Sequence, residues 1–352
     1  MILFQILVIL FCIGILVFIH ELGHFIMAKL FRMKVEKFAF GFGPEIVGFN
    51  YKNTRYCICI VPLGGMVKLP GENIEEATGA PDEFYSQPWY KRAIMAFFGP
   101  LMNYMLAIVL FAAVIFYWGI QEPVNQPVIG GVLPSKPAEK IGLKSGDKIL
   151  SIDNTKITTW QQIASIISKK EKKKLKFKIQ RENKILTFYI TPEYEPVSEK
   201  AIIGITPAVI TKKINLISSI WLGTKTSIFQ TVFTLDYLIK KIIKLQKPEV
   251  SGPIGVAQIL ANATEAGIEK FLYILGIISA ALGLFNLLPI PLVDGGHIMF
   301  SFIEALTHKP INKKIIQTAN TIGLAIIITI FVLATYNDIL RIGTNVFKNP
   351  NP

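Results

Sequence analysis

The chain has 352 residues, of which 51% are hydrophobic and 17% are charged, and its mean hydropathy is +0.47. About a quarter of the residues in an ordinary soluble protein are charged, so this composition excludes that class and indicates an integral membrane protein. The formal net charge of +13 does not require a nucleic-acid partner, and we expect none. Membrane proteins carry Lys and Arg on their cytoplasmic loops, and anionic lipids attract such residues elsewhere.

Residues 1–31 are expected to form the first membrane helix. The run 2–19 is almost uninterruptedly apolar and lacks the basic start and small-residue cleavage site of a signal peptide. The 18 residues before His20 would rise about 27 Å, close to the full hydrocarbon thickness of about 30 Å. Lys29 and Arg32 follow directly, and the positive-inside rule therefore puts His20 near the cytoplasmic face.

This first helix ends in a His-Glu-x-x-His sequence formed by His20, Glu21 and His24. Residues four apart share one face of a helix, so the two imidazoles can bind a single Zn²⁺. Glu21 can then act as the general base toward a water held by that metal. The alternative is two histidines that only hydrogen-bond the backbone at a helix end. Ionisable groups at membrane depth are costly and mark functional sites, which favours the metal site.

Residues 32–70 contain three β-type segments, broken by Gly and Pro, with a hairpin turn near 50–54. A polar, cytoplasmic connection over 71–92 leads to a second membrane helix over 93–119. No Lys or Arg follows that helix until Lys136, so its far end should be extracytoplasmic. Three free cysteines, Cys12, Cys57 and Cys59, give no disulfide framework and favour plain packing.

Residues 124–208 read as a soluble domain of short strands and one helix. Its run 169–178 holds seven lysines, which favours a solvated turn and edge strand over a lipid-binding patch. Residues 212–266 are expected to form an amphipathic interfacial helix and a linker. A fourth membrane span is expected over 320–340.

The third span, over 267–306, is interrupted by prolines and glycines between Asn286 and His297. Irregular backbone at membrane depth is tolerated only where it is buried or lines a wet cavity. Asp294, in this break, is the best third zinc ligand, and His297 is the runner-up. In the alternative interpretation Asp294 only caps the following helix. The span enters from outside, so after about 20 residues Asp294 reaches the depth of His20.

These motifs resemble the site-2 protease family of intramembrane metalloproteases, and most closely its bacterial RseP/RasP branch. The likeness rests on His-Glu-x-x-His in the first span together with Asn-x-x-Pro-x-Pro-x-x-Asp-Gly-Gly-His in a late one. It extends over nearly the whole chain through shorter matching pieces: Gly41-Phe42-Gly43-Pro44, Pro62-Leu63-Gly64-Gly65, Phe98-Gly99-Pro100 with Asn103, Gly142-Leu143 with Gly146-Asp147, and Ser251-Gly252-Pro253-Ile254-Gly255.

The resemblance implies a polytopic α-helical membrane protein with about four transmembrane helices, a membrane-reentrant β-hairpin over 35–61, and one inserted extracytoplasmic PDZ-like α/β domain. It implies one Zn²⁺ per chain, with His20, His24 and Asp294 as ligands and Glu21 as general base. It further implies that Asn286, Pro289 and Pro291 hold the substrate. Members of this branch with periplasmic sensing carry two PDZ domains, whereas this chain has room for one.

The expected function is regulated intramembrane proteolysis in the bacterial cytoplasmic membrane. The partners would be membrane lipids and single-pass membrane proteins such as anti-sigma factors or signal-peptide remnants. An unwound substrate can pair with an exposed strand edge, and the strand over 54–61, with Asn286, is the candidate for that role. The alternatives are a catalytically inactive, membrane-tethered PDZ scaffold and a cation transporter. A transporter would need polar residues at several depths, and we find them at one.

Overall fold

The computed structural model describes residues 2–195, 200–244 and 251–348, and the chain divides into two compact units. One unit combines Met1–Tyr117 with Asn215–Pro352, and the other is Trp118–Ile214. We call them the helical unit and the insert unit, and we describe each by itself.

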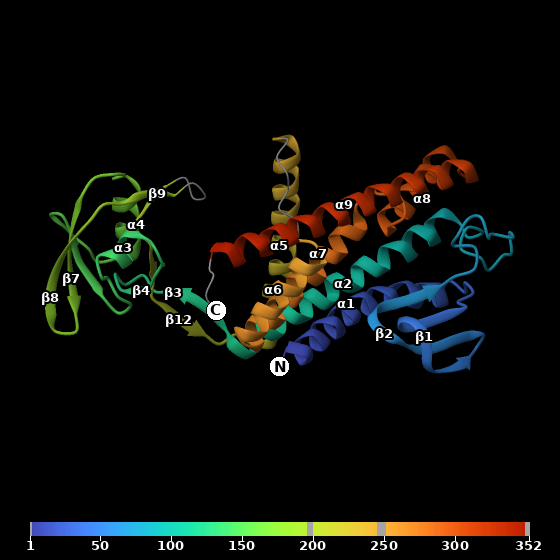
Figure 1. The fold of residues 1–352 in the computed structure, drawn as a ribbon, viewed down its shortest axis with the longest axis horizontal. Coiled ribbons are helices and arrows are strands. Elements are labelled where there is room, and N and C mark those ends of the chain that lie inside the picture. The colour runs from blue at the N-terminus through green and yellow to red at the C-terminus, as the bar shows by residue number, and fades with distance from the viewer. Residues whose placement is uncertain (1, 196–199, 245–250, 349–352) are drawn as a thin grey trace. The chain divides into compact units, whose positions relative to one another are not determined.

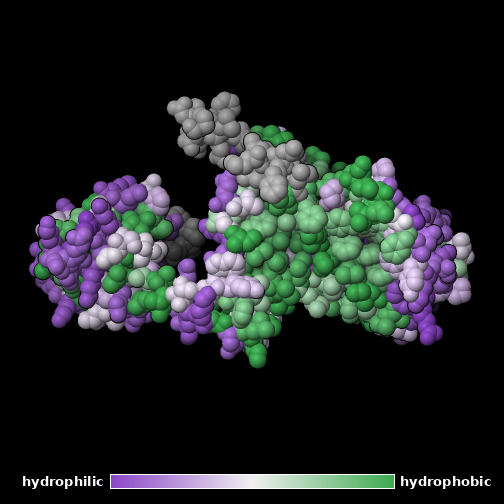
Figure 2. All heavy atoms as spheres, turned by 90° about the horizontal axis from the view of Figure 1, so that it is seen from below, coloured by the Kyte–Doolittle hydropathy of each residue, from purple (hydrophilic) through white to green (hydrophobic). Residues whose placement is uncertain are grey.

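Among its described residues, the helical unit contains four helices that are long and apolar enough to cross a membrane: α1 (Ile2–Leu30), α2 (Trp89–Trp118), α7 (Ile268–Leu287) and α9 (Lys313–Lys348). Three more helices accompany them: α5 (Leu216–Ile243), α6 (Pro253–Glu265) and α8 (Asp294–Thr307). Figure 1 shows α1, α2, α7 and α9 inclined in a common direction, with α5 crossing them steeply. Figure 2 shows the broad hydrophobic face of this unit, bounded by hydrophilic residues at the end where α1 ends and α2 begins.

Helix α2 begins at Trp89, directly after Pro88, rather than at Ala93 as the sequence suggested. The polar connection expected over 71–92 placed Lys91 and Arg92 outside this helix. Arg92 is nevertheless only 5% exposed, because Glu304 of α8 forms an ion pair with its guanidinium. A buried charge that has such a partner can lie inside a helix.

Two long strands, β1 (Lys37–Tyr51) and β2 (Thr54–Lys68), pack on α1. Their register is not that of a simple hairpin, because Lys37–Phe40 pairs both with Arg55–Ile58 and with Gly65–Lys68. Arg55–Ile58 also pairs with Val47–Asn50 on its other side. The expectation that 54–61 offers a free strand edge is therefore wrong for this segment: its backbone is occupied on both sides. Gly65–Lys68 pairs only with Lys37–Phe40, so it is an outer row of the β-region, and it lies beside α1.

Helix α5 packs through small residues rather than through its large apolar ones. Among the residues of α5 whose burial is described, the buried ones are Ser219, Gly223 and Ser227, spaced four apart. A Cβ on Gly223 would lie 2.8 Å from the Ile108 carbonyl oxygen of α2, so the two backbones are in close contact. The apolar residues that predicted an amphipathic helix, such as Ile217 and Trp221, point away from the unit and are exposed.

The insert unit is built around a four-stranded antiparallel sheet in the order β6-β5-β7-β8. Its core includes Ile149, Ile163 and Phe177. The elements are β3 (Ile120–Pro123), β4 (Ile129–Val132), α3 (Pro137–Lys140), β5 (Lys148–Ile152), β6 (Thr155–Lys156), α4 (Trp160–Ser168), β7 (Leu175–Arg181), β8 (Lys184–Ile190), β9 (Glu193–Glu195), β10 (Lys200–Ile202), β11 (Ile205–Pro207) and β12 (Val209–Lys212).

The lysine-rich run 169–178 forms a turn and most of β7. The lysines on β7 alternate with buried Leu175, Phe177 and Ile179, so they lie on its solvated face. The predicted edge strand is wrong, however, because β7 lies between β5 and β8. Alternation identifies the exposed face of a strand but not its place in the sheet.

A buried ion pair joins β7 to the turn before β5. Asp147, whose side chain is 1% exposed, accepts hydrogen bonds from Arg181 Nε at 2.7 Å and from Arg181 Nη2 at 2.8 Å. The Lys144 N–H donates a third bond at 2.9 Å. Burial acts to raise the pKa of Asp147, but these donors outweigh it and hold the pKa below its ordinary value.

We predict that Asp147→Asn lowers the free energy of unfolding of the insert unit by about 2 kcal/mol at pH 7. Breaking a fully buried ion pair destabilises a protein more than this, and breaking an exposed pair destabilises it less. We expect an intermediate loss because Asp147 is buried, whereas Arg181 is 28% exposed. The pair stabilises the unit above the unfolded-state pKa of about 3.9, and this stabilisation is lost as the pH falls through the lower folded-state pKa. Urea-dependent proteolysis of the full chain in detergent measures both effects.

The matched control is Asp153→Asn, which removes the partner of Lys170 from an exposed pair with a 2.8 Å contact. We expect a change below about 1 kcal/mol for this variant. Equal losses for both variants would show that the burial of Asp147 does not matter.

Candidate metal centre

Three side chains from two distant segments converge inside the helical unit. His20 and His24 lie on α1 and are 6% and 7% exposed. Asp294 is the first residue of α8, and its carboxylate oxygens lie 3.0 Å from His20 Nε2 and 3.2 Å from His24 Nε2. The two Nε2 atoms are 3.2 Å apart, and one ligand atom from each residue lies within 4.8 Å of the others. The structure thus brings together all three residues that the sequence nominated as ligands.

Glycines let α1 and α2 approach closely at this point. A Cβ on Gly23 of α1 would lie 2.3 Å from the Phe98 carbonyl oxygen of α2. A Cβ on Gly99 of α2 would lie 2.3 Å from His24 Nε2 and 2.9 Å from His20 Cε1. A side chain at position 99 would therefore occupy the space where the imidazoles meet Asp294.

The far ring nitrogens of both histidines have partners on α2. His24 Nδ1 lies 2.9 Å from the Met95 carbonyl oxygen, which can only accept, so this nitrogen carries the proton. Nε2 of His24 is then free to donate its lone pair to a metal. His20 Nδ1 lies 3.1 Å from the side-chain amide of Asn103, a fully buried residue. The amide atom nearest the ring is Nδ2, whereas Oδ1 is buried without a partner. Exchanging these two atoms, which have nearly the same shape, lets Oδ1 accept the Nδ1 proton and frees Nε2 of His20 as well.

Asp294 does not act as a helix cap. Helix α8 has Val293 at its N-cap, and no side chain there hydrogen-bonds the first turn. The alternative interpretation of Asp294 as a capping residue is therefore wrong. The chain between α7 and α8 turns tightly: a Cβ on Gly295 would lie 2.0 Å from the Leu288 carbonyl oxygen, and Leu292 has φ +84°. This turn directs the Asp294 carboxylate toward α1.

His297, the runner-up ligand, is not part of the three-residue cluster among the described residues. One helical turn beyond Asp294, its ring packs edge-on against Phe84, with the ring centroids 5.4 Å apart. The connection over 71–92 thus contacts α8 close to the candidate centre.

Glu21 faces the outer row of the β-region. Its Oε2 accepts a hydrogen bond from the Val67 N–H at 3.2 Å. Gly65 lies against the same side chain, because a Cβ there would be 3.2 Å from Glu21 Cγ. The Val67 N–H of the Gly65–Lys68 row is therefore hydrogen-bonded to Glu21, the carboxylate that the sequence predicts as the general base.

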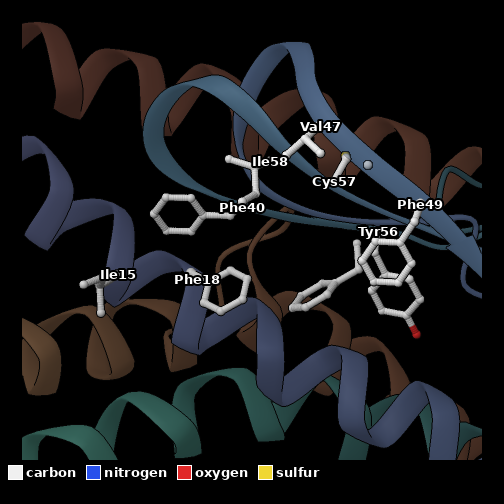
Figure 3. A pocket seen from close by; sticks show the side chains of 10 residues that line it. Ile15, Phe18, Phe40, Val47, Phe49, Tyr56, Cys57 and Ile58 are labelled. Atoms are coloured by element: carbon white, nitrogen blue, oxygen red, sulfur yellow. The ribbon is translucent and has the colours of Figure 1, made fainter.

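An aromatic cavity of about 500 Å³ lies between α1 and the strands. Phe18, two residues before His20, extends toward it, and Phe40, Phe49 and Tyr56 line its other walls (Figure 3). The Phe18 and Phe40 ring centroids are 5.3 Å apart in an edge-on contact. This packing holds the strands against the segment of α1 that carries His20.

Asn286 lines a different apolar cavity of about 490 Å³, between α1, α6, α7 and α9. Pro289 and Pro291 are in the turn between α7 and α8 and are not among the residues that line it. Pro291 packs on α9, since a Cβ on Gly323 would lie 2.2 Å from its carbonyl oxygen. Only Asn286 among the three nominated substrate-binding residues thus reaches this cavity.

Gly99 and Asn103 belong to the motifs that carry the resemblance, but no role was predicted for either. The Gly99-Pro100 pair and a polar Asn103 one turn later, inside an apolar helix, were the available signal. Gly99 and Asn103 contact the histidines from a different helix, and such a contact produces no periodic pattern in the sequence.

The donor set fits zinc. Asp294 Oδ2 is buried and has no hydrogen-bond partner, although Nε2 of His20 lies 3.0 Å away, so a metal held between them would satisfy this oxygen. Two imidazole nitrogens and one carboxylate oxygen make a common ligand set for catalytic zinc, which leaves the fourth position to water or substrate.

Comparison with known proteins agrees with this donor set. The model of peptidase family M50 matches residues 8–330. A Clostridium acetobutylicum protein whose name describes a candidate zinc metalloprotease is 33% identical over 96% of this chain and 98% of its own length. A Rickettsia conorii protein named in the same way is 34% identical over 93% of this chain and 96% of its own length.

Among solved structures, the PDZ domain of an SdrC-like protein from Listeria monocytogenes is 21% identical and covers 25% of this chain and 93% of its own, with a TM-score of 0.22. The family match extends over most of the sequence and includes the His-Glu-x-x-His motif. The chain therefore belongs to peptidase family M50, the site-2 proteases, and it is a membrane zinc metalloprotease.

Proposed function

We propose that the protein is an intramembrane endopeptidase that hydrolyses peptide bonds within or near the transmembrane segments of single-pass membrane proteins. The supporting observation is the convergence of Asp294 on His20 and His24 of α1, a helix that is long and apolar enough to cross a membrane. Ionisable residues in such helices are costly and are retained for function.

In this proposal His20, His24 and Asp294 hold one Zn²⁺ per chain. When bound, zinc supplies a Lewis acid that polarises the scissile carbonyl and lowers the pKa of the attacking water toward 7. Glu21 accepts the proton of that water and passes it to the leaving nitrogen. The buried position of the two histidines keeps bulk water away from the reacting groups.

A substrate helix must first unwind, because all its backbone N–H and C=O groups are paired internally. We propose that the unwound segment pairs with the Gly65–Lys68 row, where it would take over the Val67 N–H that Glu21 now holds. Its apolar side chains would enter the cavity that Asn286 lines. Pro289 and Pro291 would shape the turn that carries Asp294.

The proposed location is the bacterial cytoplasmic membrane, with the β-region re-entering the bilayer. Lys29, Arg32 and Lys34 follow the motif helix, which favours a metal centre near the cytoplasmic side. The insert unit, as a PDZ-like domain, would then be extracytoplasmic and could exclude substrates with bulky ectodomains or bind a new C-terminus. Anti-sigma factors and signal-peptide remnants are the substrate classes we propose.

Replacing the general base should separate catalysis from metal binding. We expect Glu21→Gln to slow peptide hydrolysis by about 10²- to 10⁴-fold, because it removes the proton acceptor, and to leave the zinc content unchanged. Cleavage of a single-pass substrate in proteoliposomes measures the rate, and atomic absorption measures the zinc. Glu122→Gln, which removes the exposed partner of Lys212 outside the proposed site, is the matched control and should cleave normally. Wild-type cleavage by Glu21→Gln would refute the assigned base.

The third ligand can be tested against its runner-up. Asp294→Ala should weaken zinc binding by more than about 100-fold, beyond the usual effect of an indirect contact. His297→Ala should retain zinc, because this ring packs on Phe84 outside the cluster. Competition with a chelator during dialysis measures both affinities. Zinc loss from His297→Ala, with zinc retained by Asp294→Ala, would reverse the assignment.

Asn103 should act as a positioning residue through His20. We expect Asn103→Leu to lower zinc affinity by about 10- to 100-fold, because Nδ1 of His20 loses the amide that sets its tautomer. Asn103→Asp, which can still accept from Nδ1, should restore part of the affinity. Asn320→Leu on α9 replaces another amide that is inside a candidate span and serves as the control. An unchanged zinc affinity in Asn103→Leu would limit the residue to packing.

A further inference from the structure

A basic cavity lies in the helical unit at the end where α2 and α9 begin. It has a volume of about 930 Å³, and its walls come from the start of α2, the end of α8 and the turn into α9. Four cations line it: Arg92, Lys309, Lys313 and Lys314. His308 also lines it.

The carboxylate that lines this cavity already has partners. Glu304 is the one carboxylate among the described residues that line it. One of its oxygens pairs with Arg92, and the other accepts the Ile311 N–H at 3.1 Å. The three lysines therefore have no carboxylate partner inside the cavity, and they are exposed.

The side chain of Arg92 is a second, independent indication that this cavity binds a ligand. The residue is 5% exposed, and its Nε is buried without a hydrogen-bond partner. The guanidinium lies over the Tyr85 ring, 5.5 Å from its centroid, which fixes its plane. A buried Nε–H without a partner is costly, and an acceptor that entered the cavity could satisfy it.

The cavity lies where lipid headgroups would be. Trp89 and Lys313 are the first residues of two helices able to span a membrane, so the cavity marks the end of both spans. Trp89 is 44% exposed, and Trp is enriched at the membrane–water interface. Exposed Leu306 and Ile315 lie close by in sequence on α8 and α9 and offer an apolar flank for acyl chains.

We infer that this cavity binds the headgroup of an anionic phospholipid, with its phosphate among Lys309, Lys313 and Lys314 and its acyl chains along the flank of α8 and α9. Basic pockets between membrane helices are known to hold such headgroups, and each Lys or Arg near an anionic surface contributes attraction. A lipid bound here would contact α2, α8 and α9 together.

The test uses the full chain purified in detergent. Native mass spectrometry would compare the binding of dioleoyl phosphatidylglycerol with that of dioleoyl phosphatidylcholine, which has the same acyl chains and no net charge. We expect the anionic lipid to bind more tightly. The triple variant Lys309→Gln, Lys313→Gln, Lys314→Gln should weaken that binding by about tenfold or more. The matched triple variant in the insert unit, Lys169→Gln, Lys172→Gln, Lys173→Gln, loses the same charge and should bind normally.

Melting temperatures in lipid-free detergent show whether the variants fold, and inorganic phosphate serves as a competitor. Equal binding of the two lipids, or equal weakening by the two triple variants, would overturn the proposal. Displacement of the lipid by an equal concentration of inorganic phosphate would also overturn it, because the site would then recognise a free anion without acyl chains. Weakening confined to the first triple variant, with phosphate ineffective at that concentration, supports it.

Discussion

The close contact between α1 and α2 is the constraint on which the metal centre depends. Gly23 lies against the Phe98 backbone, and Gly99 lies against the imidazoles of His20 and His24. A Cβ at position 99 would overlap Nε2 of His24 and crowd Cε1 of His20, so the close packing of the two helices also sets the geometry of the site. Small residues let membrane helices approach this closely, because no hydrophobic force draws helices together within lipid. The same approach brings Met95 and Asn103 to the far side of the rings.

A second constraint concerns the backbone of the β-region. Its two inner rows, Lys37–Phe40 and Arg55–Ile58, are paired on both sides, and its two outer rows are Val47–Asn50 and Gly65–Lys68. The Gly65–Lys68 row instead turns its Val67 N–H to Glu21, so the carboxylate is held beside a strand edge. A peptide that paired with this edge would displace the carboxylate from Val67 at the moment when the proposed mechanism needs it as a base.

The basic cavity and the metal centre share their supporting helices. Arg92 on α2 pairs with Glu304 on α8, and Asp294 begins that same helix. Tyr85 lines the cavity, lies beneath Arg92 and also contacts the ring of His297, with centroids 6.4 Å apart. A lipid headgroup held in the cavity would therefore contact α8, the helix that carries Asp294, the third proposed zinc ligand.

The sequence by itself determined the membrane class, the motif helix and Asp294 as the candidate third ligand. Hydropathy and four-residue spacing are local properties, and the expected depth of Asp294 comes from counting residues along a span. The sequence could not determine which residue is the partner in each tertiary contact. The interior position of Arg55–Ile58, the burial of Arg92 against Glu304, the outward large side chains of α5 and the amide of Asn103 facing His20 were decided by the tertiary structure. Each of these joins segments far apart in the chain, where periodicity carries no information about the partner.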